Sequence, residues 1–147
     1  MQKAYLASVF CGHSYRMNIQ RIKETCLYVA DLDRTRAFYE GGLGLPVISY
    51  VAGRHVFFRA GDSVLLCFNA EATEQETSLP PHGASGSIHL AFEVDKMSYE
   101  TTIKQIEEAG IEIIHHQEWK NGCRSFYFHD PDGHLVEIIE EGLWEKG

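Results

Sequence analysis

The stretch Ser125-Phe-Tyr-Phe-His-Asp-Pro-Asp-Gly-His-Leu-Val-Glu-Ile-Ile139 decides the fold, because it predicts a strand, a tight turn and a second strand. Residues 130–133 are Asp, Pro, Asp and Gly, the order that a type I turn favours. Aromatic and β-branched residues on both sides form runs of strand length. Glu137 stands out among its apolar neighbours, because a lone carboxylate there is costly unless it is paired, exposed or bound to a metal.

The rest of the chain repeats one pattern of strand, helix and three strands. Strands are expected at residues 24–29, 47–51, 55–60 and 63–68 in the first half, and at 87–94, 111–117, 123–129 and 135–140 in the second. Asp31 or Asp33 is expected to cap a helix that reaches Glu40, with Ala37 and Phe38 on its buried stripe. The second helix is expected at residues 97–109, with an apolar face of Met97, Ile103 and Ile106.

An internal alignment supports this repeat. Glu24 aligns with His89 at an offset of 65 residues, and Gly44 aligns with Gly110 at an offset of 66. Neither half can bury both faces of its own sheet, so the halves should pair. The predicted fold is α+β, with two paired βαβββ modules that form a curved mixed sheet around a concave site. We expect a single domain over 1–147, with an N-terminal extension (1–20), a first module (21–70), a linker or lid (71–86) and a second module (87–141).

Composition excludes several classes of function. The 147 residues are 44% hydrophobic and carry a net charge of −8, which argues against nucleic acid or an anionic membrane as the main partner. No apolar run is long enough to cross a bilayer. Four scattered cysteines indicate a reduced, cytoplasmic protein. The first 16 residues make a poor signal peptide, and Met17 is an alternative start.

Three strands are expected to direct polar side chains at one cavity. Glu24 and His89 occupy equivalent first positions of their strands, and alternation turns both away from the helix-covered face. Glu137 has the parity that lets it face the same cavity. Two carboxylates and one imidazole suit a divalent cation with open positions for water or substrate. The competing interpretation of each residue alone is a hydrogen-bonded structural histidine or a solvent-facing glutamate.

Five segments of the chain resemble the vicinal oxygen chelate superfamily, which includes glyoxalase I, fosfomycin-resistance thiol transferases, extradiol dioxygenases and bleomycin-binding proteins. They are Leu27-Tyr-Val-Ala-Asp-Leu32, Phe38-Tyr39, Leu43-Gly-Leu45, Ile88-His-Leu-Ala-Phe-Glu-Val94 and Asp130-Pro-Asp-Gly-His-Leu-Val-Glu137. The resemblance implies the glyoxalase/bleomycin-resistance-like fold and a divalent metal (Zn, Ni, Mn or Fe) held by Glu24, His89 and Glu137. Glu24 replaces the usual histidine. Leu66 stands about where glyoxalase I has a fourth ligand, so a three-ligand site is implied.

The resemblance implies a metal-dependent enzyme that chelates adjacent oxygens of a small substrate, in a glyoxalase-like isomerisation or a thiol transfer. Glu137 is the first choice for general base. Tyr127 matches a substrate-contacting tyrosine of the fosfomycin-resistance enzymes, although a packed aromatic is an equal alternative. A homodimer and a thiol cosubstrate are further implications.

Other residues are candidates from their position alone. Cys26 and Tyr28 share the face of Glu24 and could line the substrate pocket. An anionic substrate could bind Arg124 or another of the cationic candidates Arg54, Arg59, His115 and His116, although such side chains are more often solvated. His129 and His134 are expected to be structural. The residues 71–86 are expected to form a lid.

Two other functions stay open. A metal-free protein that sequesters a small molecule, as the bleomycin-binding members do, would use the cavity without the ligand set. Extradiol ring cleavage is less favoured, because those enzymes have two histidine ligands and a longer chain.

Overall fold

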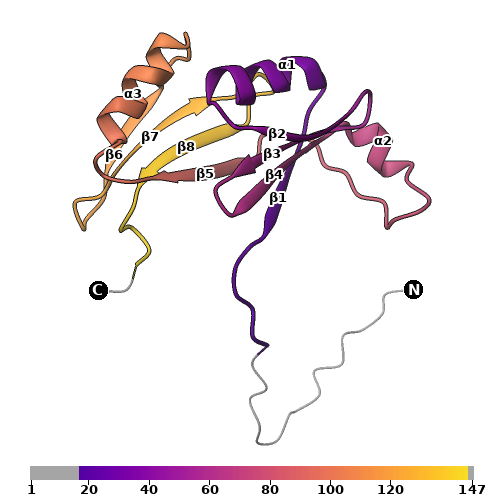
Figure 1. Cartoon of the computed structure of the whole chain (residues 1–147), viewed down its shortest axis with the longest axis horizontal. Coiled ribbons are helices and arrows are strands. Elements are labelled where there is room, and N and C mark those ends of the chain that lie inside the picture. Colours follow the sequence, from indigo (N-terminus) through magenta and orange to yellow (C-terminus); the bar gives the residue numbers. More distant parts are fainter. Residues whose placement is uncertain (1–16, 146–147) are drawn as a thin grey trace, which may run out of the picture.

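The computed structural model describes residues 17–145, so residues 1–16 and most of the expected N-terminal extension lie outside the described part. The described residues form two four-stranded sheets (Figure 1). The first has the order β1-β4-β3-β2 and the second β5-β8-β7-β6. The strands are β1 (Glu24–Tyr28), β2 (Val47–Val51), β3 (His55–Ala60), β4 (Ser63–Phe68), β5 (His89–Val94), β6 (His115–Glu118), β7 (Arg124–His129) and β8 (Leu135–Glu140).

The two sheets have the same topology, which confirms the predicted α+β fold of two βαβββ units. In each sheet the first strand pairs parallel with the fourth, and the other pairs are antiparallel. Within residues 17–145, β1 and β5 each pair with one strand, so each leaves one backbone edge unpaired. The predicted curved sheet is therefore open and divided into two.

Each sheet buries one face under a helical segment. Figure 1 shows the helices α1 (Leu32–Arg36) and α3 (Tyr99–Glu108) on the same side of the two sheets. Leu27, Phe58 and Leu65 belong to the first core, and Phe126 and Val136 belong to the second. Alternation along each strand turns the residues between these positions to the opposite, concave face.

The helices differ in detail from the prediction. Asp31 caps α1, as expected, because its Oδ1 accepts the N–H groups of Asp33 and Arg34, each at 3.0 Å. The chain then widens into a π-helical turn, η1 (Ala37–Gly42). The buried stripe is Leu32, Thr35 and Tyr39. The expected burial of Ala37 is wrong, since Ala37 is exposed.

Two further corrections concern the ends of elements. Met97 precedes α3 and is 92% exposed, so it takes no part in the apolar face formed by Ile103 and Ile106. The strand expected at residues 111–117 begins only at His115. The lid region contains a short helix that the sequence did not predict, α2 (Ala70–Glu74), capped by Asn69 Oδ1. No helix of the described chain has the length and apolarity needed to span a membrane.

The turn at residues 130–133 fastens the second unit to the first. The N–H of Gly133 donates to the carbonyl of Asp130 at 3.0 Å, which confirms the predicted type of turn contact. Across the units, Tyr39 Oη donates to Asp130 Oδ2 at 2.9 Å, and Ala30 N donates to Asp132 Oδ1 at 2.8 Å. Most of these groups are buried or partly buried, so they fix how the two units lie relative to each other.

Candidate metal centre

His89 and Glu137 lie together on the concave face of the second sheet. His89 begins β5, and Glu137 lies in the neighbouring strand β8, opposite Ala91. The distance from His89 Nε2 to Glu137 Oε2 is 3.3 Å. The side chain of Glu137 is only 7% exposed, whereas that of His89 is 49% exposed. The pair therefore combines one buried anionic group with one imidazole open to solvent.

The hydrogen bonds of this pair suit a cation. His89 Nδ1 lies 3.0 Å from the carbonyl oxygen of Leu135, and a carbonyl only accepts, so Nδ1 carries the hydrogen. The lone pair of the neutral ring then lies on Nε2 and faces a carboxylate oxygen. Two facing acceptors repel each other unless a proton or a metal ion lies between them. An imidazole whose second nitrogen is held by a backbone carbonyl is also the usual form of a metal-bound histidine.

Glu137 has a second oxygen to offer. Its Oε1 is buried and has no hydrogen-bond partner within the described residues. A buried carboxylate oxygen without a partner is costly. This orphaned acceptor and the Nε2 of His89 fit a divalent cation bound by imidazole and carboxylate ligands.

Tyr127 and His115 extend the pair into a row across the sheet. Tyr127 in β7 lies opposite Glu137 on one side and His115 in β6 on the other. The Tyr127 ring is 6.2 Å from the ring of His89 and 5.8 Å from that of His115. Burial raises the pKa of Tyr127 above its ordinary value, and the Glu137 carboxylate adds to this effect. The phenol is therefore protonated, and a donor, at neutral pH.

The first sheet carries the other predicted site residues. Glu24 is exposed at the start of β1, and Cys26 and Tyr28 are half-buried on the same face, with Cys26 Sγ 3.7 Å from Tyr28 Oη. Within residues 17–145, no group of three His, Cys, Asp or Glu side chains is placed to hold a metal ion. The structure thus brings His89 and Glu137 together, but Glu24 of the same chain does not join them.

Arg124 lies on the opposite face from Tyr127. It shares the parity of Phe126 and stacks over the Tyr99 ring of α3 at 4.4 Å. Its guanidinium donates to Glu140 Oε1 and to Glu100 Oε1, and these contacts raise its pKa. We therefore leave Arg124 out of the site and assign it to the packing of α3.

Residues 71–86, the expected lid, contribute His82, whose contacts sequence reasoning did not predict. His82 Nδ1 lies 2.6 Å from Tyr28 Oη, and the His82 ring packs edge-on against Phe68 at 4.9 Å. Arg54 Nη2 pairs with Glu76 Oε2 at 2.9 Å and so ties the same segment to the first sheet. A histidine between prolines and glycines gave no signal from which these contacts could be predicted.

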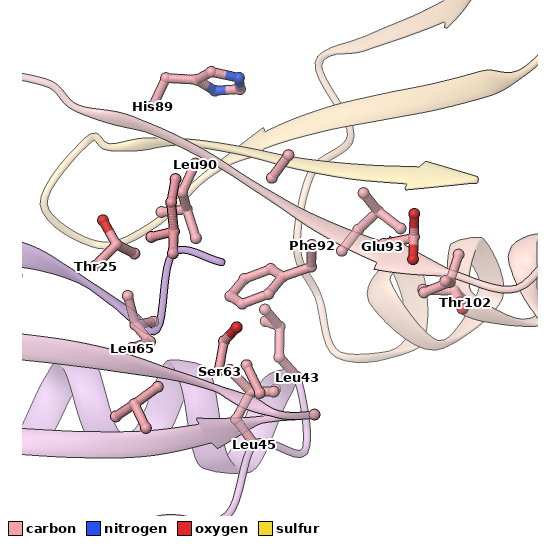
Figure 2. Close-up of a pocket in the computed structure, with 18 of the residues that line it drawn as sticks. Thr25, Leu43, Leu45, Ser63, Leu65, His89, Leu90, Phe92, Glu93 and Thr102 are labelled. Carbon is pink, nitrogen blue, oxygen red and sulfur yellow. The ribbon is translucent and has the colours of Figure 1, made fainter. Parts of the chain in front are cut away.

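A groove of about 810 Å³ lies between the two units. Figure 2 shows Leu90 and Phe92 of β5 on the same side of the strand as Leu43, Leu45 and Leu65, whereas His89 lies on the other side of β5. Most of the residues that line the groove are apolar, and Glu24 and His89 line it as well. The groove therefore borders His89, whereas Glu137 is not among its lining residues.

The sequence matches the model of the Glyoxalase/Bleomycin resistance protein/Dioxygenase superfamily over residues 21–138. The chain belongs to this superfamily. This confirms the resemblance to the vicinal oxygen chelate proteins. Among solved structures, a lactoylglutathione lyase from Agrobacterium tumefaciens superposes with a TM-score of 0.83 and 34% identity, covering 88% of this chain and all of that one.

Three named proteins are also similar in sequence to this chain over most of its length and most of their own. A glutathione transferase, FosA, from Serratia marcescens is 31% identical over 82% of this chain and 80% of its own. A metallothiol transferase, FosB, from Staphylococcus epidermidis is 28% identical over 83% and 82%. A virulence protein of Salmonella typhimurium, STM3117, is 30% identical over 86% and 88%.

Proposed function

We propose that this superfamily member is a metal-dependent enzyme of the glyoxalase-like type that acts on a small molecule with adjacent oxygen atoms. The observation that carries the proposal is the approach of His89 Nε2 to Glu137 Oε2 at 3.3 Å, next to the unpartnered Oε1 of Glu137. Held by these residues, a divalent cation (Zn, Ni, Mn or Fe) would supply Lewis acidity to the two oxygens of the substrate.

The third ligand in this proposal is Glu24 of a second copy of the chain. Side-chain bonds from the turn at 130–133 hold the two units in a position where Glu24 of the same chain stays apart from His89 and Glu137. The unpaired edges of β1 and β5, with the mostly apolar groove between the units, are a surface for such a partner. We therefore propose a homodimer in which each site draws on both copies.

In this proposal, Glu137 and Tyr127 have different roles in catalysis. Glu137 uses its carboxylate as general base, removing a proton from a carbon in an isomerisation or from a thiol in a transfer. In a transfer, the sulfur then bonds to the substrate carbon while a carbon–oxygen bond of the substrate breaks, and the oxygen leaves as an anion. Tyr127 is protonated and donates a hydrogen bond to that developing anion.

The names of the relatives favour a thiol cosubstrate. FosA is a glutathione transferase, FosB is a metallothiol transferase and the Agrobacterium protein is a lactoylglutathione lyase. We propose that this chain also acts with a thiol or on a thiol adduct. The free thiols of Cys26, Cys67 and Cys123 support a reducing, cytoplasmic location for this chemistry.

Turnover tests the proposal. The purified protein, supplied with each metal, is assayed with glutathione hemithioacetal, fosfomycin plus a thiol, and catechols. His89→Ala and Glu137→Gln should abolish the activity found, whereas His116→Ala should retain it, because His116 faces away from the row. Equal activity in the His89→Ala and His116→Ala variants would contradict the proposal.

A metal-free binding protein is the second candidate. It is favoured by the lack of a three-ligand cluster within the described part of one chain. In that function His89 and Glu137 form a hydrogen-bonded pair and the concave face sequesters a ligand. Tight ligand binding that is unchanged by chelators and by His89→Ala, without turnover, would favour it.

A further inference from the structure

The concave face of the first sheet has an ordered set of side chains of which the proposed metal site uses only Glu24. Strand register arranges the face in three rows across β1, β4 and β3. The rows are Glu24–Val64–Arg59, Cys26–Leu66–Phe57 and Tyr28–Phe68–His55. The face thus has one charged row and two that are largely aromatic or apolar.

The second and third rows contain three packed aromatic side chains, His55, Phe57 and Phe68, which we call the aromatic shelf. The His55 and Phe57 rings stack at 4.0 Å with 12° between their planes, and Phe57 meets Phe68 edge-on at 5.1 Å. Ser49 and Arg54 hold the two nitrogens of His55, each at 2.9 Å. Burial lowers the pKa of His55, and the Arg54 charge lowers it further, so the shelf is uncharged at neutral pH.

The shelf is open above Phe57 and walled at one end. Phe57 and Leu66 are half-buried, which leaves part of each side chain available for contact. At the other end, His82 of the lid packs on Phe68 and reaches Tyr28. A flat apolar group fits such a surface, because stacked and edge-on aromatic contacts favour planar partners.

Arg59 supplies the charge next to the shelf. Arg59 is exposed on the concave side of β3, one row from Phe57. Among residues 17–145 it is the one arginine with no side-chain ion pair or hydrogen bond; the others pair with carboxylates, namely Arg21, Arg34, Arg36, Arg54 and Arg124. An unpaired guanidinium in a chain of net charge −8 is suited to an anionic group that arrives from outside.

We propose that this face binds a small molecule with a planar apolar body and an anionic group, such as an aromatic carboxylate or sulfonate. The body lies on the half-buried Phe57 and Leu66, against the wall formed by Phe68 and His82, and the anion pairs with Arg59. Two strand spacings separate Arg59 from Glu24, roughly 10 Å. That the bound molecule is the substrate rests on the proposed function, in which Glu24 completes the metal site. The binding itself requires no metal.

Two fluorescent probes that differ in one group test this inference. Anilinonaphthalene sulfonate has the planar body and the anion, and phenylnaphthylamine has the body alone. Both are titrated in the presence of EDTA, against wild type and the variants Arg59→Gln, Phe57→Leu and Arg36→Gln. Arg36 is the matched control, because it is a surface arginine on α1, paired with Glu40. The titrations are repeated in the His89→Ala variant. Because this variant lacks a proposed metal ligand, unchanged probe binding there shows that the result does not depend on the metal site.

We expect Arg59→Gln to weaken sulfonate binding about tenfold, since a hydrogen bond to a charged group is lost, and to leave the neutral probe unchanged. Phe57→Leu should weaken both probes, and Arg36→Gln neither. Sulfonate affinity within about twofold of wild type in Arg59→Gln, or an equal loss in Arg36→Gln, would overturn the inference. Amide shifts in the wild-type NMR spectrum decide the case if Phe57→Leu does not fold. The shifted amides should lie in the three rows of the first sheet. Shifts confined to the groove at Leu90 and Phe92 would overturn the inference.

Discussion

His134 Nε2 donates a hydrogen bond to the carbonyl oxygen of Tyr28 over 2.9 Å, and so joins the turn after β7 to the end of β1. Its Nδ1 accepts from the N–H of Ile88 at 3.1 Å. The ring is 2% exposed and links the leading strands of both units. Because His89 follows Ile88 directly, this contact also fixes where the candidate metal ligand begins its strand.

Replacing His134 by Phe should lower the free energy of unfolding by about 2–4 kcal/mol, because the buried N–H of Ile88 and the carbonyl of Tyr28 lose their partner. The matched control is His129→Phe on the other side of the turn, where the side chain is exposed. Urea denaturation measures both. A loss in His134→Phe no larger than in His129→Phe would show that the link between the units is not stabilising.

Tyr127→Phe should lower kcat by about 100–1,000-fold, since one hydrogen-bond donor to the developing anion is removed. Metal content and stability should not change. The raised pKa of Tyr127 means that its proton is retained as pH rises through the ordinary value of 10.0. The kcat profile of the wild type should therefore show no loss due to Tyr127 below that pH. Steady-state kinetics from pH 6 to 10 check both points, and a Tyr127→Phe enzyme with wild-type kcat would refute the role.

Arg124→Met should destabilise the fold by about 1–3 kcal/mol, discounted for the partial exposure of the guanidinium, and should leave kcat unchanged. The side-chain hydrogen bonds from Arg124 lower the pKa of Glu140, so this stabilisation is complete above the ordinary value of 4.5 and is lost as pH falls below it. Unfolding at pH 7 and at pH 3 should therefore show a smaller difference between variant and wild type at the lower pH. A fall in kcat without a fall in stability would contradict this assignment and indicate that Arg124 contacts the substrate.

Mixing two inactive variants tests whether the site is shared between copies. Glu24→Ala and His89→Ala should each lose metal and activity. In a mixed dimer, one site receives Glu24 from the second variant and His89 from the first, so it is intact. Co-refolding of the two should restore part of the wild-type activity per dimer. No recovery in a purified mixed dimer would place all three ligands in one chain.

Much of the fold was predictable from local patterns. The alternation in Glu24, Cys26 and Tyr28 gave their common face, and the order Asp-Pro-Asp-Gly gave the turn at 130–133. The π-helical turn and α2 were missed, because tertiary contacts and a single Asn69 cap determine such short helices.

The candidate site was predictable in part. Parity placed Glu137 and Tyr127 on one face, and the same rule applied to Arg124 would have placed it with Phe126 on the helix side. The separation of Glu24 from His89 was not predictable, because it depends on how the turn at 130–133 docks on the first unit. That docking brings together residues about a hundred positions apart in the chain, such as Ala30 and Asp132, and leaves no local pattern.

Elemental analysis of the gently purified protein is the most direct test of the proposed metal site. After incubation with Zn²⁺, Ni²⁺, Mn²⁺ or Fe²⁺ and removal of excess ion, the wild type should retain about one ion per chain, as expected for a site of three protein ligands. His89→Ala should retain almost none, while His116→Ala should match the wild type. Less than about a tenth of an ion per chain in the wild type with every metal, or equal retention in His89→Ala, would contradict the account.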